Sequence, residues 1–168
     1  MNMQIQGAHA HVNNLNTRCE KHGEDSVPAA DLKVTMTCTV DDVTRLAGET
    51  GKTGPLSSMY DKAGSLKYFS IAHVAFDMTF EHQRITIDER EIEDATVKGL
   101  KAIPKDGRTV DLVATIQFAP SAELLGDIFE NLLDQDVEIS IVAMNPDLGL
   151  EGGGRNADDD DDEEDDEE

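Results

Sequence analysis

Four positively charged residues cluster around one predicted β-hairpin and are the side chains best suited to binding a charged ligand. They are Lys98, Lys101, Lys105 and Arg108. A fifth cation, Lys67, is followed directly by the aromatic residues Tyr68 and Phe69. Cations on β-strands can contact the phosphates of a single nucleic-acid strand while neighbouring rings stack on its bases. These seven residues are the candidate nucleic-acid-binding set. The alternative is that the lysines only protect a strand edge from aggregation.

No segment of the sequence matches a catalytic or cofactor-binding motif. The stretch Gly48–Thr53 (GETGKT) ends as a phosphate-binding loop does, but Leu46 stands where that loop needs its first glycine. Pro55 also follows where the helix of such a loop would begin. Paired carboxylates are abundant, and in so acidic a chain they indicate a solvated surface rather than a general acid. We therefore expect no enzymatic activity and no cofactor.

Three histidines and a cysteine near the N-terminus raise the question of a metal site. His9 and His11 would share one strand face, and Cys19 and His22 have a Cys-x-x-His spacing. Zinc binds such nitrogen and sulfur ligands, but the Cys-x-x-Cys pair usual in zinc sites is missing. We predict no metal, and whether these four side chains meet stays open. Cys38 lies on the apolar face of a predicted strand, and we expect both thiols to be reduced.

The chain ends in an uninterrupted run of acidic residues. The net charge is −22, and without residues 158–168 there remain 25 acidic and 14 basic residues, which gives −11. Adjacent carboxylates repel one another, so we predict a disordered tail. On a flexible tether, such a polyanion would compete for a basic surface of its own domain or dock on partner proteins. The candidate partner-binding tail consists of Asp158, Asp159, Asp160, Asp161, Asp162, Glu163, Glu164, Asp165, Asp166, Glu167 and Glu168.

Alternating apolar and polar residues predict a mostly β fold that would position these side chains. The alternating segments are Met3–Val12 with a bulge at Gly7, Leu32–Val40, Val74–Phe80, Arg84–Asp88, Thr96–Ile103, Thr109–Phe118 and Asp136–Ala143. Pro104, Asp106 and Gly107 supply turn chemistry before the strand that starts at Thr109, which indicates a β-hairpin. We expect an antiparallel OB-like barrel or a compact β-sandwich with one main helix.

Two helices are predicted. The apolar stripe of Ser121–Leu133 indicates an amphipathic helix, with Ser121 as its N-cap, that packs across one opening or face of the β structure. A shorter helix is predicted from Asp41 to Ala47, with Asp41 or Asp42 as its cap.

The remaining segments are predicted to be loops and connections. The polar stretch His22–Pro28 is a predicted loop, and Glu49–Ser65 is predicted to be a mobile loop because it is rich in Gly, Ser and Thr and lacks periodicity. Residues 1–148 would then form one β-rich globular domain. Residues 149–157 are a Gly-rich linker and residues 158–168 are the acidic tail.

The layout resembles acidic-tailed single-stranded DNA-binding proteins of bacteriophages, which combine a small β-rich domain, a helix, a glycine-containing linker and an acidic C-terminus. The stretch Asn14–Lys33 also resembles phage early-region proteins of unassigned role, through Asn14–Arg18 (NLNTR), Glu20–Asp25 (EKHGED) and Pro28–Lys33 (PAADLK). The tail departs from many such binders because it ends in acidic residues only, without a hydrophobic tip.

The resemblance implies sequence-independent binding of single-stranded DNA in phage replication or recombination. The tail would serve for autoinhibition and for docking replication or recombination proteins, in the cytoplasm of a bacterial host. No 18-residue apolar run and no signal-peptide pattern is present, so we expect no membrane contact. The oligomeric state stays open, with a homo-oligomer among the alternatives. The charge of −11 favours an alternative, an acidic protein-binding module or DNA mimic that inhibits a host nucleic-acid-binding protein. A virion assembly role is a third interpretation.

Overall fold

The computed structural model describes residues 3–46, 55–67 and 73–144. Tyr68, Phe69, the linker 149–157 and the acidic tail 158–168 lie outside the described residues. Strands dominate the described part of the chain, as predicted. They are β1 (Gln4–His22), β2 (Asp25–Thr39), β3 (Val74–Phe76), β4 (Phe80–Ile87), β5 (Arg90–Lys105), β6 (Thr109–Phe118) and β7 (Asp136–Ala143).

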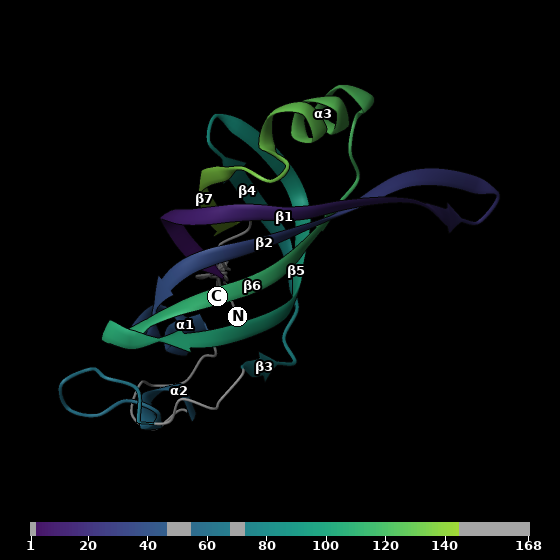
Figure 1. Cartoon of the computed structure of the whole chain (residues 1–168). Helices are drawn as coiled ribbons and strands as arrows, with labels where there is room; N and C mark the ends of the chain where they lie inside the picture. The colour runs from purple at the N-terminus through teal and green to yellow at the C-terminus, as the bar shows by residue number, and fades with distance from the viewer. Residues whose placement is uncertain (1–2, 47–54, 68–72, 145–168) are drawn as a thin grey trace, which may run out of the picture.

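Six of these strands form a closed antiparallel barrel (Figure 1). The strand order is β5-β4-β7-β1-β2-β6, and a further pairing of β6 with β5 closes the ring. The short strand β3 adds to β5 outside the ring. Of the two architectures expected from the sequence, the barrel is confirmed.

Alternation along each strand separates an apolar interior from a polar exterior. On β6 the inward residues are no more than 4% exposed, and they are Val110, Leu112, Ala114, Ile116 and Phe118. Because a shift by one residue would turn this whole set outward, burial fixes the register of the strand. The predicted irregularity in β1 is confirmed, since its register with β7 shifts between Ile5 and Ala8 and Gly7 has φ of 58°.

The main helix begins where the sequence predicts. The Ser121 hydroxyl accepts a hydrogen bond of 3.1 Å from the backbone N–H of Leu124, which caps α3 (Ala122–Asp127). The helix continues as a π-helical turn, η2 (Ile128–Leu132), and α3 lies across one end of the barrel (Figure 1). None of the helices in the described ranges combines the length and hydropathy that crossing a bilayer requires.

The shorter helix α1 (Val40–Leu46) has a different cap from the one predicted. The Thr39 hydroxyl accepts from the backbone N–H of Asp42 at 3.1 Å, and the Asp42 carboxylate accepts from the backbone N–H of Thr39 at 3.2 Å. This reciprocal capping box makes Thr39 the N-cap and Asp42 its partner in the first turn. Neither aspartate is therefore the cap.

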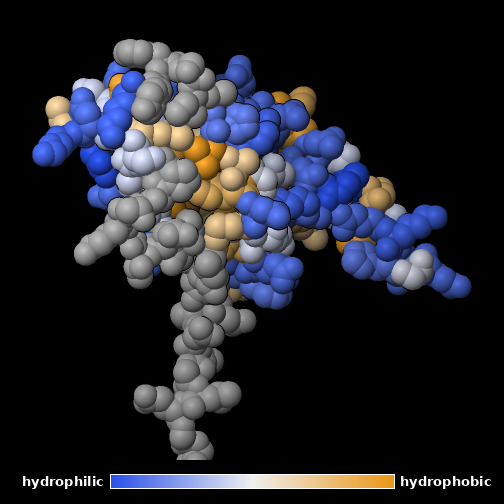
Figure 2. All heavy atoms as spheres, turned by 90° about the horizontal axis from the view of Figure 1, so that it is seen from below, coloured by the Kyte–Doolittle hydropathy of each residue, from blue (hydrophilic) through white to orange (hydrophobic). Residues whose placement is uncertain are grey.

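The predicted loop at His22–Pro28 is wrong, because most of this stretch belongs to two paired strands. β1 and β2 stay in register from Thr17 opposite Ala30 to His22 opposite Asp25, with the turn between them. β2 pairs with β6 only as far as Ala30, so the hairpin projects from the barrel as a two-stranded arm (Figure 1). We call residues 18–29 the arm. Figure 2 shows it as a hydrophilic projection.

The prediction of a mobile loop up to Ser65 is also wrong for its described part. This segment contains the short helix α2 (Pro55–Ser58), and Tyr60 in the same segment is 4% exposed. The Tyr60 hydroxyl lies 2.8 Å from the carbonyl oxygen of Lys105 and 2.9 Å from that of Thr109. The buried ring and its polar tip therefore anchor residues 55–67 to the turn between β5 and β6.

Candidate nucleic-acid interface

A β-bulge places Lys98 and Lys101 on the same side of β5. In a regular strand, residues three apart point to opposite faces. Here the register of β5 with β6 shifts between Lys98 and Lys101, and Gly99 has φ of 65°. The extra residue restores the outward phase, so Leu100 is 2% exposed while Lys101 is exposed. The bulge thus gathers cations that regular geometry would separate.

A lysine that sequence reasoning did not single out joins them. Lys33 of β2 is paired with Thr115 of β6, and Thr115 is also paired with Lys98 of β5. With neighbouring strands about 4.8 Å apart, the backbones of Lys33 and Lys98 lie about 10 Å from each other across the outer surface. We call Lys33, Lys98, Lys101 and Lys105 the cationic face.

Two of these lysines have no side-chain partner within the described ranges. Neither the Lys33 nor the Lys101 side chain makes a hydrogen bond or ion pair with any residue that the structure describes. Lys105 forms an ion pair of 3.2 Å with Asp111, and both side chains are partly exposed. Surface pairs of this kind contribute less than about 1 kcal/mol. The pair can therefore open at little cost when a phosphate approaches Lys105.

Arg108 and Lys67 do not belong to this face, although both were candidates. The Arg108 guanidinium lies 3.4 Å from Asp41 and 5.7 Å from the centroid of the Tyr60 ring. It therefore holds the hairpin turn against α1 and residues 55–67. The Lys67 ammonium donates to the backbone carbonyl of Ser58 at 3.2 Å. Both cations stabilise the attachment of this segment rather than extend the cationic face.

Aromatic rings do not accompany the cationic face in the described part of the chain. Tyr68 and Phe69, the predicted stacking residues, lie outside it. Phe80 and Phe118 are in the core, Phe76 of β3 is partly buried against that core, and the exposed ring is Phe129 of η2, with 66% of its surface accessible. The described geometry therefore offers phosphate contacts, and base stacking on Tyr68 and Phe69 stays a prediction.

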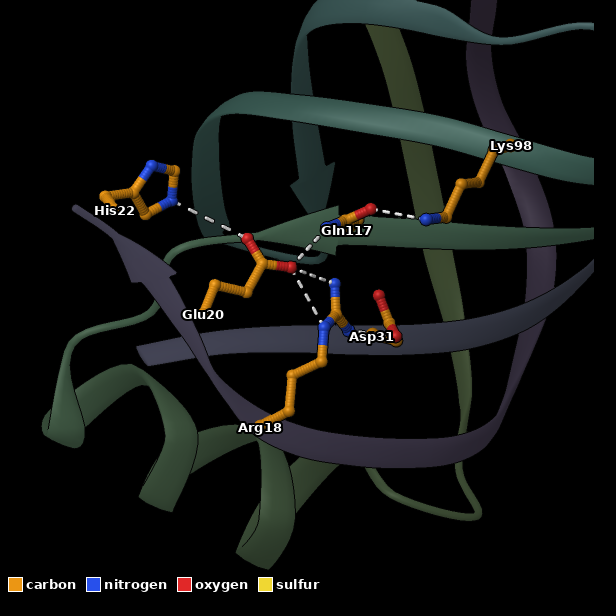
Figure 3. Close-up of polar contacts among 6 residues, drawn as sticks. All are labelled: Arg18, Glu20, His22, Asp31, Lys98 and Gln117. Atoms are coloured by element: carbon orange, nitrogen blue, oxygen red, sulfur yellow. Dashed lines mark hydrogen bonds and ion pairs between the residues drawn. The ribbon is translucent and has the colours of Figure 1, made fainter. Parts of the chain in front are cut away.

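A polar network joins Lys98 to the root of the arm (Figure 3). Lys98 donates to the side-chain oxygen of Gln117, and the Gln117 amide donates to Glu20 at 3.0 Å. Arg18 donates to Glu20 at 2.9 and 2.6 Å and also contacts Asp31. Hydrogen bonding from Arg18 lowers the pKa of Glu20 below its ordinary value. The network thus contains three donor side chains, Arg18, Gln117 and Lys98, and two carboxylates, Glu20 and Asp31.

Acidic residues concentrate on the wall formed by β4, β7, the start of β5 and the helix above them. Residues 81–94 and 123–138 hold twelve acidic and two basic residues, so these two segments carry a net charge of −10. The domain without its tail carries −11. Charge is therefore segregated, and the cationic face is a local exception on an acidic barrel.

The four metal candidates are not brought together. His11 lies 2.9 Å from Asp136 and 3.2 Å from Asp134, whereas His22 lies 3.8 Å from Glu20. Within the described ranges, no three histidine, cysteine or acidic side chains are grouped as metal ligands. Both Cys19 and Cys38 are free thiols.

A pocket of about 590 Å³ lies between β1, β2 and α1, and the Cys38 thiol in its lining is a candidate nucleophile. Its lining includes His9, Cys38, Asp42 and Arg45. Burial raises the pKa of the Cys38 thiol to about 12. Because the thiolate is the reactive form, this thiol is not a nucleophile at neutral pH.

Comparison with known protein families, with curated protein sequences and with solved structures finds no match to this chain. The interpretation of the cationic face therefore rests on its own residues and on the barrel that positions them.

Proposed function

We propose that this protein binds single-stranded DNA without sequence preference and that the cationic face contacts the sugar–phosphate backbone. The observation that carries the proposal is the bulge at Gly99, which turns Lys98 and Lys101 to one side, next to Lys33. Phosphate contacts dominate nucleic-acid affinity and require no particular base. Cations on two strands, β2 and β5, that flank β6 suit a backbone that crosses all three.

The segregation of charge supports this choice of surface. A polyanion is repelled by the wall that carries −10 and meets the lysines on β2 and on the later part of β5. The proposal explains how a chain with an acidic balance can hold nucleic acid, because the local field rather than the net charge acts at contact distance. Binding should consequently be weak at high ionic strength.

The order of elements supports the proposal by analogy. β4, β5 and β6 form an antiparallel meander, a helix follows, and β7 returns beside β4. OB-folds bind oligonucleotides on the face of strands 2 and 3 of a five-stranded barrel. If the meander corresponds to their first three strands, β5 and β6 are that face. In this protein the β1–β2 hairpin completes a ring of six strands.

We extend the proposal to the acidic tail. Residues 158–168 follow a Gly-rich linker and would reach the lysines of their own domain at high effective concentration. The tail would then occupy the cationic face in the absence of DNA and become available to replication or recombination proteins once DNA displaces it. On the resemblance of the layout, we propose that these processes belong to phage replication or recombination.

The test is a titration of labelled oligothymidine with the full chain at salt concentrations from about 20 to 200 mM. The proposal expects binding at low salt and a linear fall of the logarithm of the association constant with the logarithm of the salt concentration. No binding at the lowest salt would reject it.

A second candidate function follows from the acidic wall. Twelve carboxylates on β4, β7 and the adjoining segments could occupy the basic groove of a host nucleic-acid-binding protein, as a DNA mimic does. In that case oligothymidine would not bind. The protein would instead compete with DNA for the host protein, and charge reversal on the wall would abolish the competition while reversal of the lysines would not.

A further inference from the structure

The Glu20 carboxylate occupies a cluster of donors that would suit another anion. Arg18 donates to its Oε1 atom through Nε at 2.9 Å and through Nη2 at 2.6 Å. The Gln117 amide donates to the same oxygen at 3.0 Å. The other oxygen, Oε2, has one recorded contact among the described residues, with Nε2 of His22 at 3.8 Å. Three donors thus converge on one oxygen while the second has a single long contact (Figure 3).

The donors are held by groups other than Glu20. A separate nitrogen of Arg18, Nη1, contacts Asp31 of β2. Lys98 donates to the Gln117 side-chain oxygen, which turns the amide nitrogen of Gln117 toward Glu20. Removal of the Glu20 carboxylate would therefore leave Arg18 and Gln117 in place. A set of donors that persists without its occupant is a preorganised anion site.

Glu20 is a replaceable occupant of this site. It is about one-third exposed and lies on the part of β1 that pairs only with β2, within the arm. A carboxylate that offers one oxygen to three donors uses the arginine fork poorly. A phosphate presents several oxygens and accepts from the two edge nitrogens of an arginine in parallel, which is the stronger arrangement.

We propose that Arg18, Gln117 and Lys98 form a phosphate-binding cradle in which the Glu20 carboxylate is an internal competitor. This inference rests on the proposed function and deepens it. The cradle continues the cationic face from β5 across β6 and β2 to β1, so a bound strand crosses the barrel toward the arm. Glu20 leaves when a backbone phosphate arrives, and the remaining contact of Arg18 with Asp31 keeps the guanidinium oriented.

The first test follows the donors directly in the full chain. Nitrogen-15 NMR reports the Arg18 Nε–H and the Gln117 side-chain amide during titration with oligothymidine and, separately, with inorganic phosphate. The inference expects oligothymidine to shift both signals together with the backbone amides of Lys101 and Val113. If those backbone amides shift and the Arg18 and Gln117 side chains do not, the cradle is rejected while the proposed function stands. If nothing shifts, both are rejected.

Inorganic phosphate separates the two sources of the anion. Shifts of the Arg18 and Gln117 side chains with phosphate, without any response to oligothymidine, would support the cradle and reject the nucleic-acid function. The inference also expects the response to phosphate to be stronger in Glu20→Ala, because the internal competitor is gone. An equal or weaker response in that variant would overturn the role of Glu20.

The second test uses a matched change of charge. Glu20→Ala should tighten oligothymidine binding about tenfold at low salt, because it removes one negative charge and frees one phosphate position. Glu24→Ala removes the same charge from the turn of the arm, where the side chain makes no contact with a described residue that the structure records. Its effect should be less than about twofold. Equal tightening in both variants would mean that general charge alone acts, and would overturn the cradle.

Discussion

Lys33 of β2 and Lys98 of β5 lie on either side of the same residue, Thr115 of β6, in backbone register. The two lysines are far apart in sequence, and the pairing of β2 with β6 brings them together. Each therefore raises the local potential at the other, and a phosphate above Thr115 would be within reach of both. The lysines of β5 and Lys33 of β2 therefore form one continuous cationic surface.

The bulge that aligns Lys98 with Lys101 depends on Gly99, which gives a prediction for stability. A Cβ at Gly99 would lie 3.6 Å from the Thr115 hydroxyl, so space is sufficient, but its φ of 65° is unfavourable for alanine. Gly99→Ala should lower the free energy of unfolding by about 1 kcal/mol.

Gly126 of α3 is the control for this substitution. It lacks a positive φ, and an added Cβ would meet no atom within 4 Å. Gly126→Ala should therefore raise stability by about 0.5 kcal/mol, because alanine has less conformational freedom to lose on folding. Urea unfolding of both variants measures the difference. A stabilising Gly99→Ala would show that the bulge does not require glycine.

A second prediction about stability concerns the buried side-chain amide of Gln83. Gln83 is 2% exposed, its Nε2 atom donates to the Glu81 carbonyl at 2.7 Å, and its side-chain oxygen has no partner within the described part of the molecule. A buried unpaired acceptor is unfavourable by about 1–3 kcal/mol. Gln83→Met keeps the volume and removes this acceptor, so the midpoint of urea unfolding should rise. Gln83→Glu should lower it, because it places a charge there. A lower midpoint for the methionine variant would contradict the assignment.

Stability should depend on pH through His11. The hydrogen bond to Asp136, with a smaller contribution from Asp134, raises the pKa of His11 above its ordinary value. Protonated His11 therefore favours the folded state. This contribution is fully present below the unfolded pKa of about 6.5 and is lost as pH rises through the higher folded pKa.

The measurement compares urea midpoints at pH 5.5 and 8.5. His11→Gln should reduce the loss of stability between these values, although His82 retains a similar dependence through Asp94. His9→Gln serves as the control, because the structure records no contact of the His9 side chain with a described ion-pair or hydrogen-bond partner. The pH assignment is wrong if both variants lose the same amount of stability on going to pH 8.5.

The acidic tail should weaken binding of oligothymidine by competing for the cationic face. A chain that stops at Gly149 should bind more tightly than the full chain, and the gain should be larger at low salt. Fluorescence anisotropy with labelled oligothymidine measures both. The gain should shrink in Lys33→Gln/Lys101→Gln, because tail and DNA would use the same lysines. Equal affinities with and without the tail would remove autoinhibition from the account.

Local patterns predicted most of the strands and the main helix, because their information lies in neighbouring residues. The alternation in Asp136–Ala143 and the cap at Ser121 are examples, and both are confirmed. The arm was missed because residues 22–26 at its tip are polar or glycine and show no apolar alternation, so cross-strand pairing rather than burial holds the tip. The anchoring of Tyr60 was missed for a related reason, since its hydroxyl meets a turn 45 residues away.

The candidate site was predicted only in part. The hairpin around Pro104 and its lysines could be located from turn chemistry and charge. The place of Lys33 could not, because it follows from strand order, which local patterns do not contain. Arg108 was assigned to phosphate, but its contacts with Asp41 and Tyr60 depend on tertiary packing. The phase change at Gly99 had a signal in the sequence, since a glycine between two lysines three apart suggests a bulge.

The most direct test of the central claim is the salt dependence of oligothymidine binding after two lysines are neutralised. Lys33 and Lys101 make no contact with the described residues that their loss would break, so Lys33→Gln/Lys101→Gln should fold normally. Arg45→Gln/Arg84→Gln is the matched control, with Arg45 on α1 and Arg84 on the acidic wall. Each phosphate contact contributes about 0.7 to the slope of log K against log salt for a single strand. The account predicts that the lysine variant loses about 1.4 from this slope and that the arginine variant keeps it. An unchanged slope in the lysine variant, or an equal loss in both, would contradict the claim that the cationic face binds the backbone.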